Sequence, residues 1–181
     1  MNIILIIGES ARSDHFGING YARKTTPLIN EVKNLVSFAD VTPCSNNTRT
    51  SVSCLLSHKS REEFRIPMLH TNIISIFNQL GYRTAWYGTQ SAFGYSNIIL
   101  QTASYAKTKR HQNHYRAKVK GYGDNKGLML DEYVLPDLKK ALKNDNKNFI
   151  VLHTNGSHQP HERFVSQSFF KFSPYCFNVD H

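Results

Sequence analysis

The sequence predicts an α/β fold in which a parallel or mixed sheet is covered by helices on both faces. Short apolar runs typical of strands occur at residues 2–8, 83–87 and 149–152. Amphipathic segments at 72–80 and 128–143 separate them, and this alternation is typical of a mainly parallel sheet. The chain has 181 residues, of which 40% are hydrophobic and 19% charged. This length and composition fit one globular domain.

The first strand, Asn2 to Gly8, is expected to be wholly buried, because five consecutive apolar residues leave it no polar face. Glu9 follows at the carboxyl end of this strand. Open α/β sheets bind ligands at that edge. Glu9 is therefore better placed for chemistry than for packing.

The next segment predicts a helix and then a strand. Thr25 and Thr26 can cap a short amphipathic helix with Pro27 in its first turn, and apolar residues continue at helical spacing to Leu35. Residues 36–41 alternate apolar with polar side chains, which predicts a second strand.

The remaining elements follow from periodicity and stop signals. Residues 72–80 predict a helix that ends at Gly81. Pro136 predicts a kink in the helix over 128–143, or its division into two. Residues 104–126 have weak periodicity, so we expect an irregular surface excursion there.

The formal net charge of +9 favours anionic partners. Residues 104–126 hold seven basic residues and three tyrosines, a pattern that also suits nucleic-acid binding with steep salt dependence. A solvated loop or a surface facing anionic lipid explains the same charges, and we expect no nucleic-acid partner. The basic residues are Lys107, Lys109, Arg110, Arg116, Lys118, Lys120 and Lys126.

The longest apolar run, Ile3 to Ile7, is far shorter than the roughly 18 residues that span a bilayer. No basic segment precedes it and no small-residue cleavage site follows it, so we expect neither an anchor nor a secretory signal in these residues. Of the three cysteines, Cys44 and Cys54 could close a small loop or remain reduced thiols.

Three segments are expected at the ends of strands or in the loops after them: residues 8–12, 44–54 and 153–160. Together they hold a carboxylate, a hydroxyl-rich helix start and several imidazoles. Such a set suits a divalent metal that activates an oxygen nucleophile.

Five motifs in order resemble the lipid A phosphoethanolamine transferases, which include the mobile colistin-resistance enzymes and belong to the alkaline phosphatase and sulfatase superfamily. The motifs are IIGESARSDHFGINGYARKTTPLI, SFADVTPCSNNTRTSVSC, LGYRTAWYGTQ, VLHTNGSHQP and FSPYC. The resemblance covers nearly the whole chain and implies an alkaline-phosphatase-like sheet, of which this chain holds the N-terminal part.

The resemblance implies that Glu9 ligates zinc and that Thr48 is the nucleophile and a second zinc ligand. A threonine hydroxyl attacks a phosphodiester only when a metal or a base activates it. The simpler alternatives are a solvated or capping role for Glu9 and an ordinary N-cap role for Thr48, ahead of a helical stretch over 52–56. The two interpretations of Thr48 are compatible.

The resemblance also implies roles for other side chains. His158 matches a histidine near the phosphate or the leaving group, where it can donate a proton. Gln90 and His153 are assigned to substrate binding, although a histidine at a strand end is often structural. The family pattern pairs Cys44 with Cys54, which implies an oxidising compartment.

The chain departs from the family at several positions. Gln159 replaces a glycine, and residues 88–90 read Gly-Thr-Gln where relatives have Ser-Asn-Gln. Cys176 resembles the first cysteine of a pair whose partner would lie beyond His181. Asp180 with His181 imitates the later Asp-His ligand pair by coincidence, because no buried strand leads into it.

We therefore interpret residues 1–181 as a partial catalytic domain without the membrane domain and the C-terminal metal-ligand half. The expected reaction is zinc-dependent transfer of phosphoethanolamine from phosphatidylethanolamine to lipid A, lipopolysaccharide core or a glycan, through a phospho-threonine. The alternative is an inactive fragment that serves at most as a binding module. Expected partners are an anionic glycolipid, the membrane surface at the periplasmic face of the inner membrane, and a separate chain that completes the site.

Overall fold

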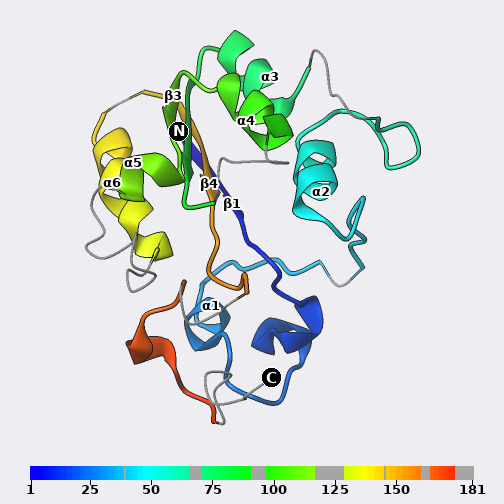
Figure 1. Cartoon of the computed structure of the whole chain (residues 1–181), viewed down its shortest axis with the longest axis vertical. Coiled ribbons are helices and arrows are strands. Elements are labelled where there is room, and N and C mark those ends of the chain that lie inside the picture. Colours follow the sequence, from blue (N-terminus) through cyan, green and yellow to red (C-terminus); the bar gives the residue numbers. More distant parts are fainter. Residues whose placement is uncertain are drawn as a thin grey trace. The chain divides into compact units, whose positions relative to one another are not determined.

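The structure is a computed structural model that describes residues 1–38, 40–65, 71–90, 97–116, 129–144, 146–159 and 164–173. The chain forms two compact units (Figure 1). The larger unit comprises Met1–Glu9 and Cys44–His181, and the smaller comprises Ser10–Pro43. None of the helices in the described ranges is long and apolar enough to cross a membrane.

The larger unit is built on a parallel sheet whose strand order, within the described residues, is β1-β4-β2-β3. Each neighbouring pair is parallel. This confirms the α/β class and the parallel sheet expected from the sequence. The strands are β1 (Asn2–Ile7), β2 (Arg83–Gly88), β3 (Thr108–Arg110) and β4 (Asn148–His153).

Helices cover both faces of this sheet. Side chains of the central strands point alternately to the two faces, and each face packs against its own set of helices. Trp86 and Val151 share one core with residues of α2, α3 and α4. Tyr87 and Leu152 share the other with α5, α6 and the 3-10 helix η4. The helices are α2 (Thr48–Leu55), α3 (Ile73–Gln79), α4 (Asn97–Ser104), α5 (Gln112–Arg116), η4 (Asp131–Val134) and α6 (Leu135–Leu142).

The prediction that the first strand is wholly buried is wrong. β1 forms, but it lies at the edge of the described sheet, with Ile4 41% and Ile6 65% exposed. Ile3 and Leu5 pack against the first core, whereas the second core contains no described residue of β1. A run of apolar residues is compatible with burial on both faces of a strand. Whether both faces are buried depends on the elements that pack against the strand.

Local signals placed α3 and α6 correctly. The Asn72 side chain accepts a hydrogen bond from the backbone N–H of Ser75 and completes a capping box at the start of α3. Pro136 divides the predicted helix into η4 and α6, and it sits in the first turn of α6, where its missing N–H costs nothing.

The expected irregular excursion over 104–126 is wrong in part. Its described portion contains β3 and α5. A strand of three residues is too short to produce a periodic pattern, and β3 forms because β2 supplies its hydrogen bonds. Residues 117–126 lie outside the described residues.

The smaller unit has less regular structure than predicted. The helix expected over 25–35 shortens to α1 (Pro27–Asn30), and the described part of 36–41 forms no strand. Val36 and Phe38 are 72% and 76% exposed. A strand needs a partner for its backbone groups, and an alternating pattern alone supplies none. Two short 3-10 helices, η1 (Ser13–His15) and η2 (Gly17–Asn19), complete the unit.

Candidate active site

The site lies at the carboxyl ends of β1, β4 and β2, which end side by side because the strands are parallel. Hydrogen bonds continue past the strands: the backbone N–H of Thr154 donates to the carbonyl of Ile7, and that of Thr89 donates to the carbonyl of His153, each at 3.0 Å. These bonds hold the three loops in register at one edge of the sheet.

Glu9 is the centre of the hydrogen bonding at this edge. Its Oε2 accepts a bond of 2.9 Å from the Thr48 hydroxyl and one of 2.6 Å from the Gln90 amide. The same amide donates to the carbonyl of Thr154 at 3.0 Å. Glu9 is buried. The structure thus brings together three predicted site residues that are far apart in the sequence.

Thr48 reaches Glu9 from the first turn of α2. Asn47 caps this helix, because its side chain accepts a 2.9 Å bond from the backbone N–H of Thr50. The N-cap role considered for Thr48 is therefore wrong. Its hydroxyl is directed to Glu9 instead, near the positive end of the helix dipole, which favours negative charge on a bound phosphate.

A disulfide between Cys44 and Cys54 links the segment before α2 to the last turns of the helix. The two Cα atoms are 6.2 Å apart, and Cys54 is buried. Thr48 lies inside the loop that this bond closes, so the bond restricts the conformations of the segment that carries it.

His153 ends β4 inside the protein. It is 2% exposed, its ring contacts the Trp86 ring edge-on at a centroid distance of 5.5 Å, and its Nε2 has no hydrogen-bond partner among the described residues. Burial lowers the pKa of His153 to about 4, the Glu9 charge opposes this shift, and His111 adds to it. The imidazole is therefore neutral at neutral pH.

His158 is not brought to the Glu9 carboxylate by any contact among the described residues. Its side chain is exposed, its ring packs edge-on against Phe164, and its Nδ1 lies 2.5 Å from the carbonyl of Gln159. Because a carbonyl only accepts, Nδ1 carries the hydrogen in this contact. The Nε2 atom is then left to exchange protons with a ligand.

Asp131 is a site residue that the sequence did not reveal. Its carboxylate accepts hydrogen bonds from the Thr89 hydroxyl at 2.5 Å and from the backbone N–H groups of Asn155 and Gly156 at 2.8 and 2.9 Å. A Cβ atom on Gly156 would lie 2.7 Å from this carboxylate. Asp131 thus joins the loop of Gln90 to the loop after β4. No sequence signal pairs residues that lie 24 positions apart.

The Glu9 carboxylate and the Thr48 hydroxyl are oxygen donors of the kind that bind zinc. Zinc takes three or four protein ligands, so this pair fits part of a site. Across the ranges that the structure describes, no three His, Cys, Asp or Glu residues gather closely enough to hold a metal ion. Cys176, Asp180 and His181 lie outside those ranges.

The sequence matches the family model described as Sulfatase over residues 1–180. It is 31% identical over 183 residues to the Kdo(2)-lipid A phosphoethanolamine 7''-transferase of Escherichia coli K12, covering 98% of this chain and 31% of that protein. It is 28% identical to the phosphatidylethanolamine transferase Mcr-1 of Escherichia coli, covering 96% of this chain and 32% of that protein. The chain spans about a third of the length of these curated relatives.

Solved structures share the fold. The C-terminal periplasmic domain of the phosphoethanolamine transferase EptC from Campylobacter jejuni has a TM-score of 0.74 and 25% identity, covering 97% of this chain and 52% of that one. The periplasmic domain of EptC from Escherichia coli in complex with Zn has a TM-score of 0.76 and 20% identity, covering 92% and 46%. The chain spans about half of each solved domain.

Proposed function

Because the chain belongs to the sulfatase family, we propose that residues 1–181 form part of the catalytic domain of a zinc-dependent phosphoethanolamine transferase. The donor is phosphatidylethanolamine, and the acceptor is lipid A, lipopolysaccharide core or another glycan. The contact between the Thr48 hydroxyl and the buried Glu9 carboxylate carries this proposal. It pairs a nucleophile with a proton acceptor at the edge where α/β sheets bind ligands.

In the first step, the Thr48 oxygen bonds to phosphorus while the bond from phosphorus to the glycerol oxygen of the lipid breaks. The hydroxyl proton passes to Glu9, which already accepts it in a hydrogen bond, and His158 protonates the departing diacylglycerol. In the second step, an oxygen of the acceptor attacks phosphorus and gives its proton to His158. The Thr48 oxygen is released and recovers its proton from Glu9.

Glu9 and Thr48 are also the described residues that would hold zinc. When bound, the metal lowers the pKa of a coordinated hydroxyl and neutralises charge on the transferred phosphate. Gln90 keeps the Glu9 carboxylate oriented through its 2.6 Å hydrogen bond. The hydrogen bond to Glu9 supports our assignment of Gln90 to the binding of the transferred phosphoethanolamine group.

In this proposal, His153 contributes a neutral imidazole to substrate binding. Its Nε2 has no partner within the described ranges, so it is available to a substrate hydroxyl, phosphate or ammonium group. A buried polar atom without a partner is costly, and binding a polar substrate group would relieve that cost.

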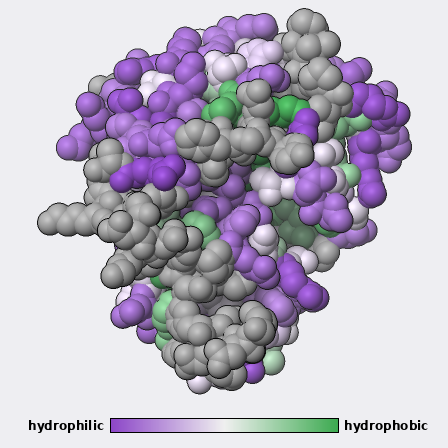
Figure 2. All heavy atoms as spheres, viewed as in Figure 1, coloured by the Kyte–Doolittle hydropathy of each residue, from purple (hydrophilic) through white to green (hydrophobic). Residues whose placement is uncertain are grey.

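We place the chain at the periplasmic face of the inner membrane, beside anionic glycolipid. The disulfide between Cys44 and Cys54 supports an oxidising compartment, and the matched EptC structures are of periplasmic domains. On the face shown in Figure 2, the described residues are mostly hydrophilic, which suits contact with lipid headgroups. Further zinc ligands would come from residues outside the described ranges or from a separate chain.

Intact-mass spectrometry tests the phospho-threonine directly. After incubation with zinc and phosphatidylethanolamine, the protein should gain the mass of one phosphoethanolamine group. Thr48→Ala should abolish the gain, whereas Thr50→Ala, on the same helix, should retain it. If no mass is gained, or if the gain survives Thr48→Ala, the proposal is wrong.

The second candidate is a binding module without transferase activity, because the chain spans only about half of the solved domains. Calorimetric titration with zinc separates the two candidates. Tight binding of one zinc ion per chain supports a working site, whereas weak binding together with no mass gain supports the binding module.

A further inference from the structure

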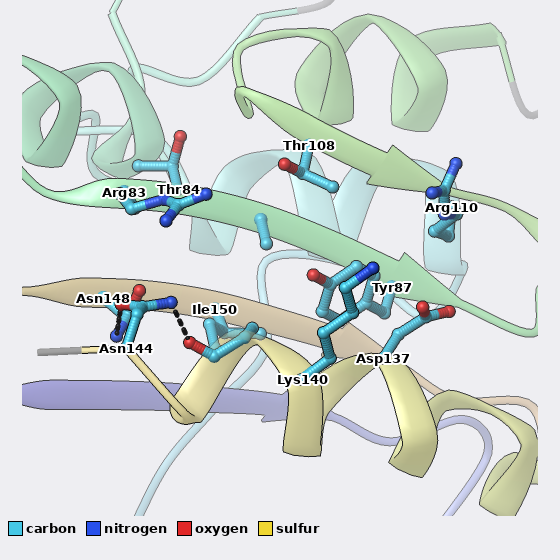
Figure 3. Close-up of a pocket in the computed structure, with 12 residues that line it drawn as sticks. Arg83, Thr84, Tyr87, Thr108, Arg110, Asp137, Lys140, Asn144, Asn148 and Ile150 are labelled. Carbon is cyan, nitrogen blue, oxygen red and sulfur yellow. Dashed lines mark hydrogen bonds between the residues drawn. The ribbon is translucent and has the colours of Figure 1, made fainter. Parts of the chain in front are cut away.

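A cavity of about 330 Å³ lies between α6 and the sheet (Figure 3). It shares no lining residue with the set formed by Glu9, Thr48, Gln90 and His153. We propose that this cavity binds a phosphate group. The proposal goes beyond the transferase function and does not depend on it.

The register of the sheet places cationic side chains on the face toward α6. Residues 83, 85 and 87 of β2 share one face of the sheet, because side chains alternate between the faces along a strand. Arg110 of β3 pairs with Tyr87. Over β4 the same face carries the buried residues Asn148, Ile150 and Leu152, which pair with Arg83, Ala85 and Tyr87 of β2. Over β2 and β3 it carries Arg83 and Arg110, which lie at opposite ends of the sheet segment in Figure 3.

The opposing wall is formed by α6 and the turn that follows it. Asp137, Lys140 and Ala141 of α6 line the cavity, together with Asn144, which follows the helix. Figure 3 shows the Lys140 side chain extending from α6 toward the sheet, beside Tyr87. Leu138, Ala141 and Leu142 of the same helix pack against the second core, whereas Asp137 and Lys140 present polar groups to the cavity.

Positive charge exceeds negative charge around the cavity. The lining contains Arg83, Arg110 and Lys140 but one carboxylate, Asp137. That carboxylate already accepts a 3.0 Å hydrogen bond from Tyr115 and lies 3.8 Å from His114 Nε2. Within the described ranges, none of the three cations forms an ion pair.

Neutral donors complete the chemistry of a phosphate site. Thr108 offers a hydroxyl at the lining, whereas the Asn148 amide already donates to Asn2, Asn144 and Asn146. Burial raises the pKa of Tyr87, and the charge of Asp137 raises it further. The phenol therefore stays protonated and can donate a hydrogen bond. Guanidinium groups bind phosphate oxygens through paired hydrogen bonds. Arg110 pairs with Tyr87 in the sheet, and Lys140 lies beside the same tyrosine in Figure 3. These two cations and the phenol favour phosphate over an apolar or cationic ligand.

Titration with inorganic phosphate tests the site. Amide resonances of the metal-free full chain are followed by NMR at constant ionic strength. We expect saturable shifts at residues 83–87 and 108–110. Lys140→Gln should weaken binding about tenfold, as for the loss of one charge-assisted hydrogen bond. Lys139→Gln changes the net charge equally but lies outside the lining, and it should leave the affinity unchanged.

Three results would overturn the inference: no saturable shifts, equal weakening by both lysine variants, or shifts confined to residues around Thr48. Arg110→Gln provides a second cavity variant should Lys140→Gln fail to fold. Repeating the titration with Thr48→Ala separates the two proposals, because cavity binding should persist when the proposed nucleophile is absent.

The same phosphate chemistry could come from a soluble metabolite or a lipid headgroup. Glycerol 3-phosphate is compared with phosphatidylcholine vesicles that contain phosphatidic acid. Binding of the soluble compound that Lys140→Gln weakens supports a site for free phosphate esters. Binding of the vesicles alone, with the same sensitivity, supports a headgroup site. If neither probe is sensitive to Lys140→Gln, the inference is wrong.

Discussion

The Thr48 hydroxyl donates a 2.9 Å hydrogen bond to Glu9, although 39 positions separate the two residues. Thr48 comes from the first turn of α2, and Glu9 from the end of β1. Gln90 donates to the same carboxylate oxygen from the end of β2. Two donors on one oxygen of this buried carboxylate fix its orientation, as supporting hydrogen bonds do for carboxylates that ligate metals.

Glu9→Gln should weaken zinc binding by about tenfold or more, because it replaces an anionic ligand with a neutral amide. Isothermal titration with zinc measures the change. Glu132→Gln, in the exposed part of η4, is the matched control and should bind zinc like the unmodified chain. Equal affinities for the chain and Glu9→Gln would exclude Glu9 as a ligand.

Replacing both Cys44 and Cys54 by alanine should lower the free energy of unfolding by about 2–3 kcal/mol, the value for a loop of this length. Chemical denaturation measures the loss. A reductant should destabilise the unmodified chain by a similar amount and leave the double variant unchanged. If the reductant affects both proteins equally, the disulfide contributes nothing to stability.

Asp131→Asn should loosen the loop after β4, because its amide would replace an acceptor that receives backbone N–H groups. We expect a cost of about 1–3 kcal/mol and faster hydrogen exchange at Asn155 and Gly156. Thr89→Val removes the hydroxyl bond alone, so it should leave that exchange nearly unchanged. Unaltered exchange in Asp131→Asn would show that the carboxylate does not hold the loop.

Acid should destabilise the metal-free protein through His153. Its pKa is about 4 in the folded chain against an ordinary value of 6.5, so between these pH values the unfolded state binds the proton and the folded state does not. Stability is complete above pH 6.5 and falls as the pH drops toward 4, by about 3 kcal/mol. His153→Gln should flatten this part of the curve. An unchanged slope would mean that His153 titrates normally.

Some elements follow from local signals alone. Asn72 and Gly81 delimit α3, and Pro136 divides the segment before β4 as predicted, because capping and proline geometry act over a few residues. β3 could not be predicted, because its three residues form a strand only beside β2. The alternating pattern of residues 36–41 predicted a strand that the described residues do not form, because a pattern does not provide a partner strand.

The candidate site also has parts that the sequence revealed and parts that only the structure revealed. Motif resemblance singled out Glu9 and Thr48, and the position of Glu9 after a strand favoured chemistry at that residue. The resemblance did not reveal that Gln90 donates to Glu9, or that Asp131 joins the loops beside them. Those contacts depend on which loops meet at the sheet edge.

By itself, the sequence determined the α/β class, the positions of the longer elements and the segments expected to carry chemistry. These features depend on periodicity and capping within short stretches of chain. Only the tertiary structure decided the exposure of β1, the hydrogen bond between Thr48 and Glu9, and the role of Asp131. Each of these depends on residues brought together across long separations, where the order of strands in the sheet determines which side chains meet.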